Sequence, residues 1–411
     1  MQRAFSAFER IRWTTPLAAI VATLAVLSYA TAASALAPGF YDLGVLPGSQ
    51  AFLSTADGVS GDGRVVVGTA TFATTVSDCC VVRHTRAFRW TEGVFTLMPP
   101  VPHEDRSIAR AVSYDGSVVT GNLYTASLSG AWQGGFVWVG NAVLPLGDLP
   151  GGSSWSVGRA ISADGTVIAG HSVDAITDRA IRWDSGVVTN LGTGTGYSYA
   201  YGVSADGNVI VGYQRENGMS VPKRWDGLVM SSLPLPPDAF GGIAYGVSAD
   251  GKVVVGRVSL SAGGQAVRWD ENGPRLLGTV RPNDESRALD TSRDGSIVVG
   301  WSYDRFLPIS EVTDAYRAMI WTEAEGARSL KEVLENDYGF DLTGWKLNTA
   351  NAISDDGRVI VGTGVNPEFL ERGWIAVLAE PESLPSCGLG GEVVLLLAPL
   401  FARRSRRGRS A

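Results

Sequence analysis

Residues 202–212 read Gly-Val-Ser-Ala-Asp-Gly-Asn-Val-Ile-Val-Gly: an apolar stretch, an Asp-Gly pair and a second apolar stretch. Asp-Gly between two such stretches is a strong signal for a tight β-hairpin, because Gly adopts a positive φ freely and Asp tolerates it. The pattern occurs seven times, with its aspartates 42–62 residues apart, at Asp62, Asp115, Asp164, Asp206, Asp250, Asp294 and Asp356. A repeat of about this length is typical of the four-stranded blades of a β-propeller.

Two further stretches follow each of the first six hairpins. The third stretch ends in tryptophan, as in residues 179–183 (Arg-Ala-Ile-Arg-Trp), and a short fourth stretch follows, as in residues 187–192. Alternation of apolar and polar residues is modest and β-branched residues are many, as expected of strands that are covered on both faces. The pattern predicts four strands per copy.

The seventh copy lacks a fourth stretch after Leu378. Residues 40–48 match the fourth stretch of the second copy, residues 144–152, so we predict that residues 40–46 pair with residues 372–377. This pairing would close the ring and remove a free sheet edge. The predicted fold is therefore all-β: a seven-bladed β-propeller of four-stranded blades, closed by the N-terminal strand.

The connections predict where a ligand would bind. Loops between second and third strands lie at the end opposite the Asp-Gly turns, and the longest are residues 70–85, 122–134 and 302–315. Rigid scaffolds place function on variable loops. We therefore predict ligand-binding residues at this end, at Trp155, Tyr197 and Tyr199.

One segment departs from the repeat. Residues 329–336 carry Leu330, Val333 and Leu334 at helical spacing, which predicts a short helix before the seventh copy. The alternative is a fourth strand followed by a long loop.

The termini predict export. Arg3, Arg10 and Arg12 precede an apolar run over 16–27 and then small residues, so residues 1–37 are predicted to be a signal peptide, the alternative being an uncleaved membrane anchor. Residues 38–380 would form the propeller.

Residues 381–411 would form a sorting tail. Cys387-Gly388 leads into an apolar stretch shorter than a usual membrane span, and five arginines follow. The tail predicts transient membrane association, processing near Cys387 and Gly388 by a sorting protease, and a final location at the cell surface or outside the cell. A frayed basic terminus is the alternative.

Charge and motifs restrict the partners. Residues 38–380 hold 26 Lys and Arg against 38 Asp and Glu, a net charge of −12, which argues against a nucleic acid partner. The sequence has no Gly-x-Ser-x-Gly, no phosphate-binding glycine loop and no His-Glu-x-x-His. We predict no catalytic activity and no cofactor.

The repeated polar residues are interpreted as structural. Each turn offers one or two aspartates, whereas a calcium loop needs several oxygen ligands in succession. The third-strand tryptophans would fill the space between blades rather than form a ligand platform. The arginines of that strand would hydrogen-bond between blades; they are Arg89, Arg182, Arg224 and Arg268.

Metal ligands are few. The one candidate cluster, Cys79, Cys80 and His84, fits no standard metal-ligand spacing, so no metal site is predicted.

Three motifs recur in order over residues 40–378: Gly-Val-Ser-Ala-Asp-Gly-x-Val-Val-Val-Gly, Ala-Phe-Arg-Trp and Leu-Gly-x-Leu-Pro-Gly-Gly. This arrangement resembles the bacterial extracellular HAF repeat, and the tail resembles PEP-CTERM and MYXO-CTERM sorting signals in its layout. The resemblance implies an exported repeat protein. We expect a binding or display scaffold for a surface glycan or protein, with a secreted glycan-active lyase or hydrolase and a purely structural matrix component as the alternatives. Acidic and aromatic residues around the axis would favour the enzyme, and small residues there would favour the scaffold.

Overall fold

The computed structural model describes residues 36–45, 50–77, 80–101, 106–127, 130–152, 155–307 and 315–379. The predicted signal peptide up to residue 35, and the sorting residues Cys387 and Gly388, lie outside these ranges. In the described residues the regular secondary structure is β-strand except for one short helix.

The first six copies of the repeat contribute four strands each, and the seventh contributes three. The first strands are β2 (Gln50–Val59), β6 (Arg106–Val112), β10 (Ser156–Ile161), β14 (Ser198–Val203), β18 (Ala239–Val247), β22 (Glu285–Thr291) and β26 (Lys346–Ile353). The second strands are β3 (Val66–Ser77), β7 (Val118–Ser127), β11 (Val167–Val173), β15 (Val209–Glu216), β19 (Val254–Leu260), β23 (Ile297–Tyr303) and β27 (Val359–Val365). The third strands are β4 (Cys80–Thr91), β8 (Gly130–Val139), β12 (Asp178–Asp184), β16 (Met219–Asp226), β20 (Gly263–Asp270), β24 (Tyr316–Thr322) and β28 (Glu371–Val377). The fourth strands are β5 (Val94–Leu97), β9 (Ala142–Pro145), β13 (Val187–Asn190), β17 (Val229–Ser232), β21 (Gly273–Gly278), β25 (Gly326–Ser329) and, from the other end of the chain, β1 (Gly39–Asp42).

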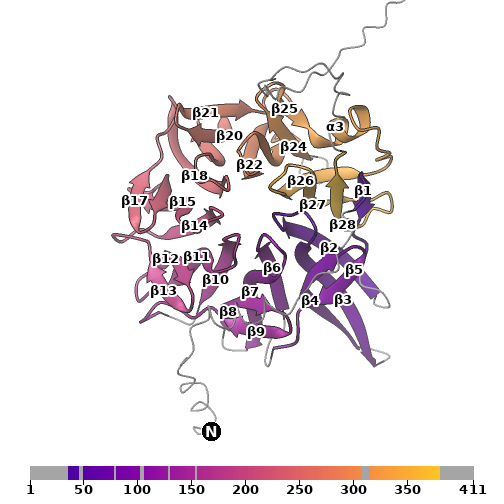
Figure 1. The fold of residues 1–411 in the computed structure, drawn as a ribbon, viewed down its shortest axis with the longest axis horizontal. Helices are drawn as coiled ribbons and strands as arrows, with labels where there is room; N and C mark the ends of the chain where they lie inside the picture. The colour runs from indigo at the N-terminus through magenta and orange to yellow at the C-terminus, as the bar shows by residue number, and fades with distance from the viewer. Residues whose placement is uncertain are drawn as a thin grey trace, which may run out of the picture.

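Within each copy the strands pair antiparallel in the order first, second, third and fourth. In the described residues this gives five four-stranded sheets and one eight-stranded sheet, in which β2–β5 and β6–β9 are joined by a parallel pair at Thr85 and Arg106. Figure 1 shows the sheets arranged around a centre, with first strands such as β6, β14 and β22 innermost and fourth strands such as β13 and β17 at the rim.

The N-terminal strand completes the last sheet, as predicted. β1 pairs antiparallel with β28, and Phe40 lies opposite Ala376 and Asp42 opposite Trp374. The ring of Phe40 lies 5.1 Å from Trp345 and 6.0 Å from Trp374. In Figure 1 the indigo β1 lies beside the yellow β28.

The Asp-Gly turns are held by their own hydrogen bonds. Ser204 Oγ donates to Asp206 Oδ1 at 2.5 Å and accepts from the amide of Val209 at 2.9 Å. Asp206 Oδ1 also accepts from the amide of Asn208 at 2.9 Å, and Gly207 has a φ of 72°. This geometry confirms a structural role for the turns. No three His, Cys, Asp or Glu side chains of the described residues lie together as a metal site.

Backbone hydrogen bonds also link each turn to the turn of the next copy, and the turn of the last copy to that of the first. The donor and acceptor pairs are Asp62 to Tyr114, Tyr114 to Ala163, Ala163 to Ala205, Ala205 to Ala249, Ala249 to Arg293, Arg293 to Asp355 and Asp355 to Gly61, at 2.9–3.1 Å.

The third-strand tryptophans are buried between sheets, as predicted. Trp225 of β16 is fully buried with Ala169 of the preceding sheet, and its indole donates to the carbonyl of Leu191 at 3.0 Å. The neighbouring arginines cross to the next sheet, which confirms their predicted role. Turn carbonyls of that sheet accept from Arg89, Arg182, Arg224 and Arg268.

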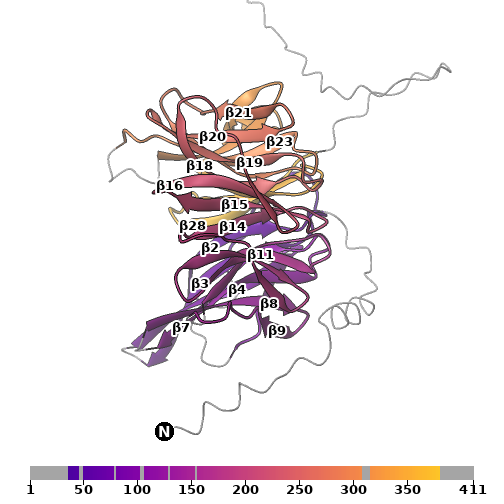
Figure 2. The same cartoon turned by 90° about the vertical axis from the view of Figure 1, so that its left-hand side faces the viewer.

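Two predicted loops are wrong. Residues 70–85 and 122–134 form extended hairpins: β3 pairs with β4 out to Ser77 and Cys80, and β7 pairs with β8 out to Ser127 and Gly130. In residues 70–85 several threonines and valines, which favour strands, let strand pairing continue past the repeat pattern. Both hairpins extend beyond the other sheets, as Figure 2 shows for the one labelled β7.

The predicted helix forms as α3 (Leu330–Asn336), with the side chain of Ser329 as its N-cap. It follows a regular fourth strand, β25, so this copy contains both the strand and the helix. Leu330, Val333 and Leu334 are buried in the core next to Trp345.

Candidate functional site

The three predicted ligand-binding residues do not form one cluster. Tyr197 lies just before β14 and Tyr199 lies on it, with ring centroids 6.0 Å apart. Trp155 lies just before β10 and is 37% exposed, and in the described residues no ring contact joins it to either tyrosine.

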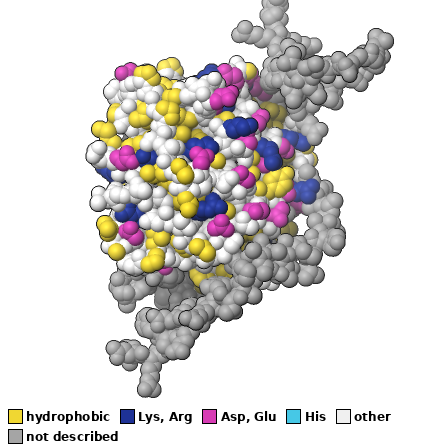
Figure 3. Space-filling model, turned by 60° about the vertical axis from the view of Figure 1, so that its left-hand side comes forward, with side chains coloured by type: hydrophobic (Ala, Val, Ile, Leu, Met, Phe, Trp, Pro, Cys, Tyr) yellow, Lys and Arg dark blue, Asp and Glu magenta, His cyan; other side chains and the backbone are white. Residues whose placement is uncertain are grey.

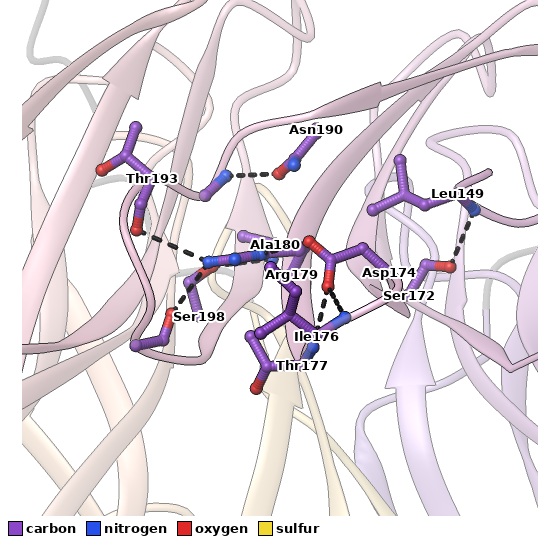
Figure 4. A network of polar contacts seen from close by, with 12 residues as sticks. Leu149, Ser172, Asp174, Ile176, Thr177, Arg179, Ala180, Asn190, Thr193 and Ser198 are labelled. Carbon is purple, nitrogen blue, oxygen red and sulfur yellow. Dashed lines mark hydrogen bonds and ion pairs between the residues drawn. The ribbon is translucent and has the colours of Figure 1, made fainter. Parts of the chain in front are cut away.

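The segment before β14 is held by a buried arginine (Figure 4). Arg179 Nε donates to Asp174 at 2.7 Å, and another of its nitrogens donates to the carbonyl of Gly196 at 3.0 Å. The hydrogen bond from Arg179 lowers the pKa of Asp174 to about 2. Because these charges satisfy each other, this network positions Tyr197 rather than offering a ligand site.

Apart from the loop residues predicted to bind a ligand, the first strands present a surface that carries large polar side chains. Small residues such as Ala200 and Ala244 are fully buried, and their neighbours in sequence are larger and partly exposed. Since side chains alternate between the two faces of a strand, the larger residues share one face. Arg159 on β10, Tyr201 on β14 and Tyr245 on β18 occupy the same position of the repeat, three residues before the turn serine.

Four of these side chains contact one another in a run across four sheets, which we call the Arg–Tyr band: Arg159, Tyr201, Tyr245 and Arg287. The guanidinium of Arg159 lies 4.8 Å from the ring centroid of Tyr201, and the rings of Tyr201 and Tyr245 are 5.2 Å apart. Arg287 on β22 lies 4.8 Å from Tyr245 and 4.8 Å from Trp301. These are cation–π and edge-to-face contacts, which hold the side chains in place.

Second-strand residues support the band. Tyr213 on β15 stacks on Tyr199 at 5.4 Å, and the ring of Tyr199 lies 4.5 Å from His171. Arg159 Nε donates to His171 Nδ1 at 3.3 Å. Burial, followed by the charge of Arg159, lowers the pKa of His171 to about 3. His171 is therefore neutral and serves as a hydrogen-bond acceptor for Arg159.

The two arginines of the band have no ion-pair partner in the part of the chain that the structure describes. Neither Arg159 nor Arg287 forms an ion pair within the described residues, and Arg287 Nε is buried there without a hydrogen-bond partner. Asp57, a carboxylate on β2, interacts electrostatically with Arg110 and not with an arginine of the band. Burial raises the pKa of Asp57. Figure 3, by contrast, shows basic and acidic side chains interspersed on the face that it presents. Other arginines do have a carboxylate partner: Arg224 and Asp226, for example, form an ion pair at 2.7 Å.

The tyrosines of the band are hydrogen-bond donors. Burial raises the pKa of Tyr245, so its hydroxyl stays protonated at neutral pH. No protein group in the described residues hydrogen-bonds the hydroxyls of Tyr201 or Tyr245, whereas Tyr199 donates to Asp178 at 2.6 Å. The band thus combines two guanidinium ions with two free phenols, all of which donate hydrogen bonds.

Only the tyrosine pair next to this band was expected from the sequence. Arg159, Tyr201, Tyr245 and Arg287 were not predicted, because the prediction considered loops and these residues lie inside strands. A signal for three of them was available: the position three residues before the turn serine is large and polar in four consecutive copies, at Arg110, Arg159, Tyr201 and Tyr245.

Comparison with known proteins supports the fold. No family model and no curated protein sequence matches the chain. Among solved structures, the chain is similar to an oligogalacturonate lyase from Vibrio parahaemolyticus, with 10% identity, 83% of this chain and 94% of that chain covered, and a TM-score of 0.53. It is also similar to the β-propeller domain of the Trilobed protease from Pyrococcus furiosus, with 8% identity, 83% and 99% covered, and a TM-score of 0.51. At these identities the likeness concerns the fold alone, and the fold is that of a β-propeller.

Proposed function

We propose that this chain is an exported, non-catalytic binding or display propeller, and that the Arg–Tyr band is its ligand-binding surface. The observation that carries the proposal is the pair of arginines, Arg159 and Arg287, held against tyrosine rings with no ion-pair partner in the described residues. Uncompensated charge inside a protein costs free energy, and a bound ligand would offset that cost.

The proposal includes a closed ring of seven blades. The turn-to-turn hydrogen bonds support it, because the last of them runs from Asp355 back to Gly61. The first strands support it as well, because each contacts the next and β26 contacts β2. Closure would place the band around the axis of the ring.

Binding fits the band better than catalysis. General acid–base chemistry needs a group that titrates near the working pH. His171 has its pKa lowered to about 3, and burial raises the pKa of Tyr213 and of Tyr245, so none of them is poised near neutrality. The tyrosines of the band are the aromatic residues expected of a glycan-active lyase or hydrolase and not the small residues expected of a scaffold. Such an enzyme would, however, require another residue to act as the base.

Export rests on the two termini. We propose that the signal peptide directs the chain out of the cytoplasm and that the arginine-rich tail holds a precursor in the membrane until a sorting protease cuts near Cys387 and Gly388. Within the described residues no helix is long and apolar enough to cross a membrane.

Intact-mass analysis of cell fractions should find a precursor ending at Ala411 and a shorter form ending near Cys387. Full-length protein alone, in the cytoplasm, would refute this part.

Binding is tested by screening the full chain against an array of glycans and surface proteins. The Arg159→Gln/Arg287→Gln variant removes the charges of the band, and Arg64→Gln/Arg281→Gln removes two exposed charges elsewhere as a matched control. We expect at least one array member to bind the wild type and the control but not the band variant. Binding that is equal in all three proteins would contradict the proposal.

A further inference from the structure

We infer that the ligand of the Arg–Tyr band is an acidic oligosaccharide that bears carboxylate groups. This inference rests on the proposed binding function and adds the chemical class of the ligand. Three features of the band lead to it: its charge, its length and its hydrogen-bonding groups.

The charge of the band requires an anion. Residues 38–380 carry a net charge of −12, yet neither Arg159 nor Arg287 forms an ion pair with a carboxylate in the described residues. Arginine binds carboxylates through two parallel hydrogen bonds. Arg287 keeps all of its nitrogens free of protein hydrogen bonds there, since its contacts to Tyr245 and Trp301 are ring contacts.

The length of the band requires more than one anionic group. The two arginines are separated by two tyrosine rings that contact each other at 5.2 Å. In this run of contacts one guanidinium ion lies at each end. A ligand that lies along the band would therefore carry an anionic group toward each end, with an uncharged part between them.

The two tyrosines in the middle of the band indicate the chemistry of the ligand segment that lies between the anionic groups. Tyr201 and Tyr245 present hydroxyl donors that no protein group of the described chain uses. Amphipathic aromatic side chains of this kind suit a partner with both apolar faces and oxygen acceptors. A chain of uronic acids offers a carboxylate on each sugar with ring and hydroxyl oxygens between them. We therefore assign carboxylate binding to Arg159 and Arg287, and sugar oxygen binding to Tyr201 and Tyr245.

The test is isothermal titration of the full chain with tetramers of galacturonate, mannuronate and a glucuronate-containing sugar. Neutral tetramers of the same parent sugars, inorganic phosphate and an oligoglutamate peptide are the comparison ligands. We expect at least one uronate tetramer to bind, with an affinity that falls as salt rises. Arg159→Gln/Arg287→Gln should weaken binding at least 10-fold and reduce the salt dependence.

Two further variants keep the result interpretable. Tyr201→Phe/Tyr245→Phe preserves the rings and should weaken binding a few-fold without changing the salt dependence, even if the arginine variant fails to fold. Arg64→Gln/Arg281→Gln should bind like the wild type. Tighter binding of a neutral tetramer, phosphate or oligoglutamate at the band would overturn the acidic-sugar assignment but leave the binding function standing. If no array member and no titrated ligand depends on the band, both proposals fail.

Discussion

Gly373 donates its backbone N–H to the hydroxyl of Ser54 at 3.2 Å, although the two residues lie 319 positions apart in the chain. The same bond joins neighbouring sheets elsewhere, for example from Ala180 to Ser198 at 2.9 Å. The fourth strands are short, so the third-strand amide beyond their end needs another acceptor, and the first-strand serine of the next sheet supplies it. The seam between the last and the first sheet is therefore built like the others.

Replacing the first-strand serine should have the same effect at Ser54, between the last and the first copies, as at Ser198, between two neighbouring copies. We expect Ser54→Ala and Ser198→Ala each to lower the free energy of unfolding by about 1–3 kcal/mol, because each leaves a buried amide without an acceptor. Urea unfolding measures the effect, with Ser231→Ala at an exposed position as the control. A loss at Ser198 with none at Ser54 would show that the last seam differs from the others.

The turn glycine should be far less tolerant than the turn aspartate. Gly207 has a φ of 72°, and a Cβ there would lie 2.6 Å from Cγ2 of Val167 in the preceding sheet. We expect Gly207→Val to cost about 1–3 kcal/mol for the backbone conformation, with an added cost for the overlap.

The matched substitution is Asp206→Asn. The hydrogen bond that Ser204 donates to Asp206 lowers the pKa of this carboxylate. Asparagine at the same position keeps the acceptor oxygen for that bond. We expect a change within about 0.5 kcal/mol. Loss of ligand binding in this variant would instead assign the turn a functional role.

Asp290 should make stability depend on pH. It accepts the amide of Ile353 in the next sheet at 3.0 Å, and burial, followed by the charge of Asp355, raises its pKa to about 6. Six other copies have Gly or Ala at this position. Because the native state holds this proton more tightly than the unfolded state, stability should fall as the pH rises from about 4 to 6, by up to about 3 kcal/mol.

The measurement is the free energy of unfolding at several pH values between 4 and 7. Asp290→Ala should lose this part of the pH dependence, whereas Asp206→Asn should retain it. An identical pH profile in the wild type and in Asp290→Ala would show that Asp290 does not titrate in this range.

The features that repeat could be predicted from the sequence, and the band could not. Asp206 and Trp225 recur in register with their copies, so periodicity reveals both the turn and the buried strand. The pairing of Phe40 with β28 was predictable because one copy lacked a strand. The contact of Tyr245 with Arg287 depends instead on how far each side chain reaches toward the next sheet, which one-dimensional spacing does not encode.

Closure by the N-terminal strand is the central claim, because the Arg–Tyr band surrounds an axis only if the ring closes. The most direct measurement is the free energy of unfolding after deletion of residues 38–43, which include Phe40 and the buried Leu43. Deletion of residues 381–411 is the control. We predict that losing the strand lowers stability by at least about 2–5 kcal/mol, the cost of emptying one buried leucine site, and that the exposed edge of β28 promotes self-association. A monomer with the unfolding free energy of the wild type would contradict closure.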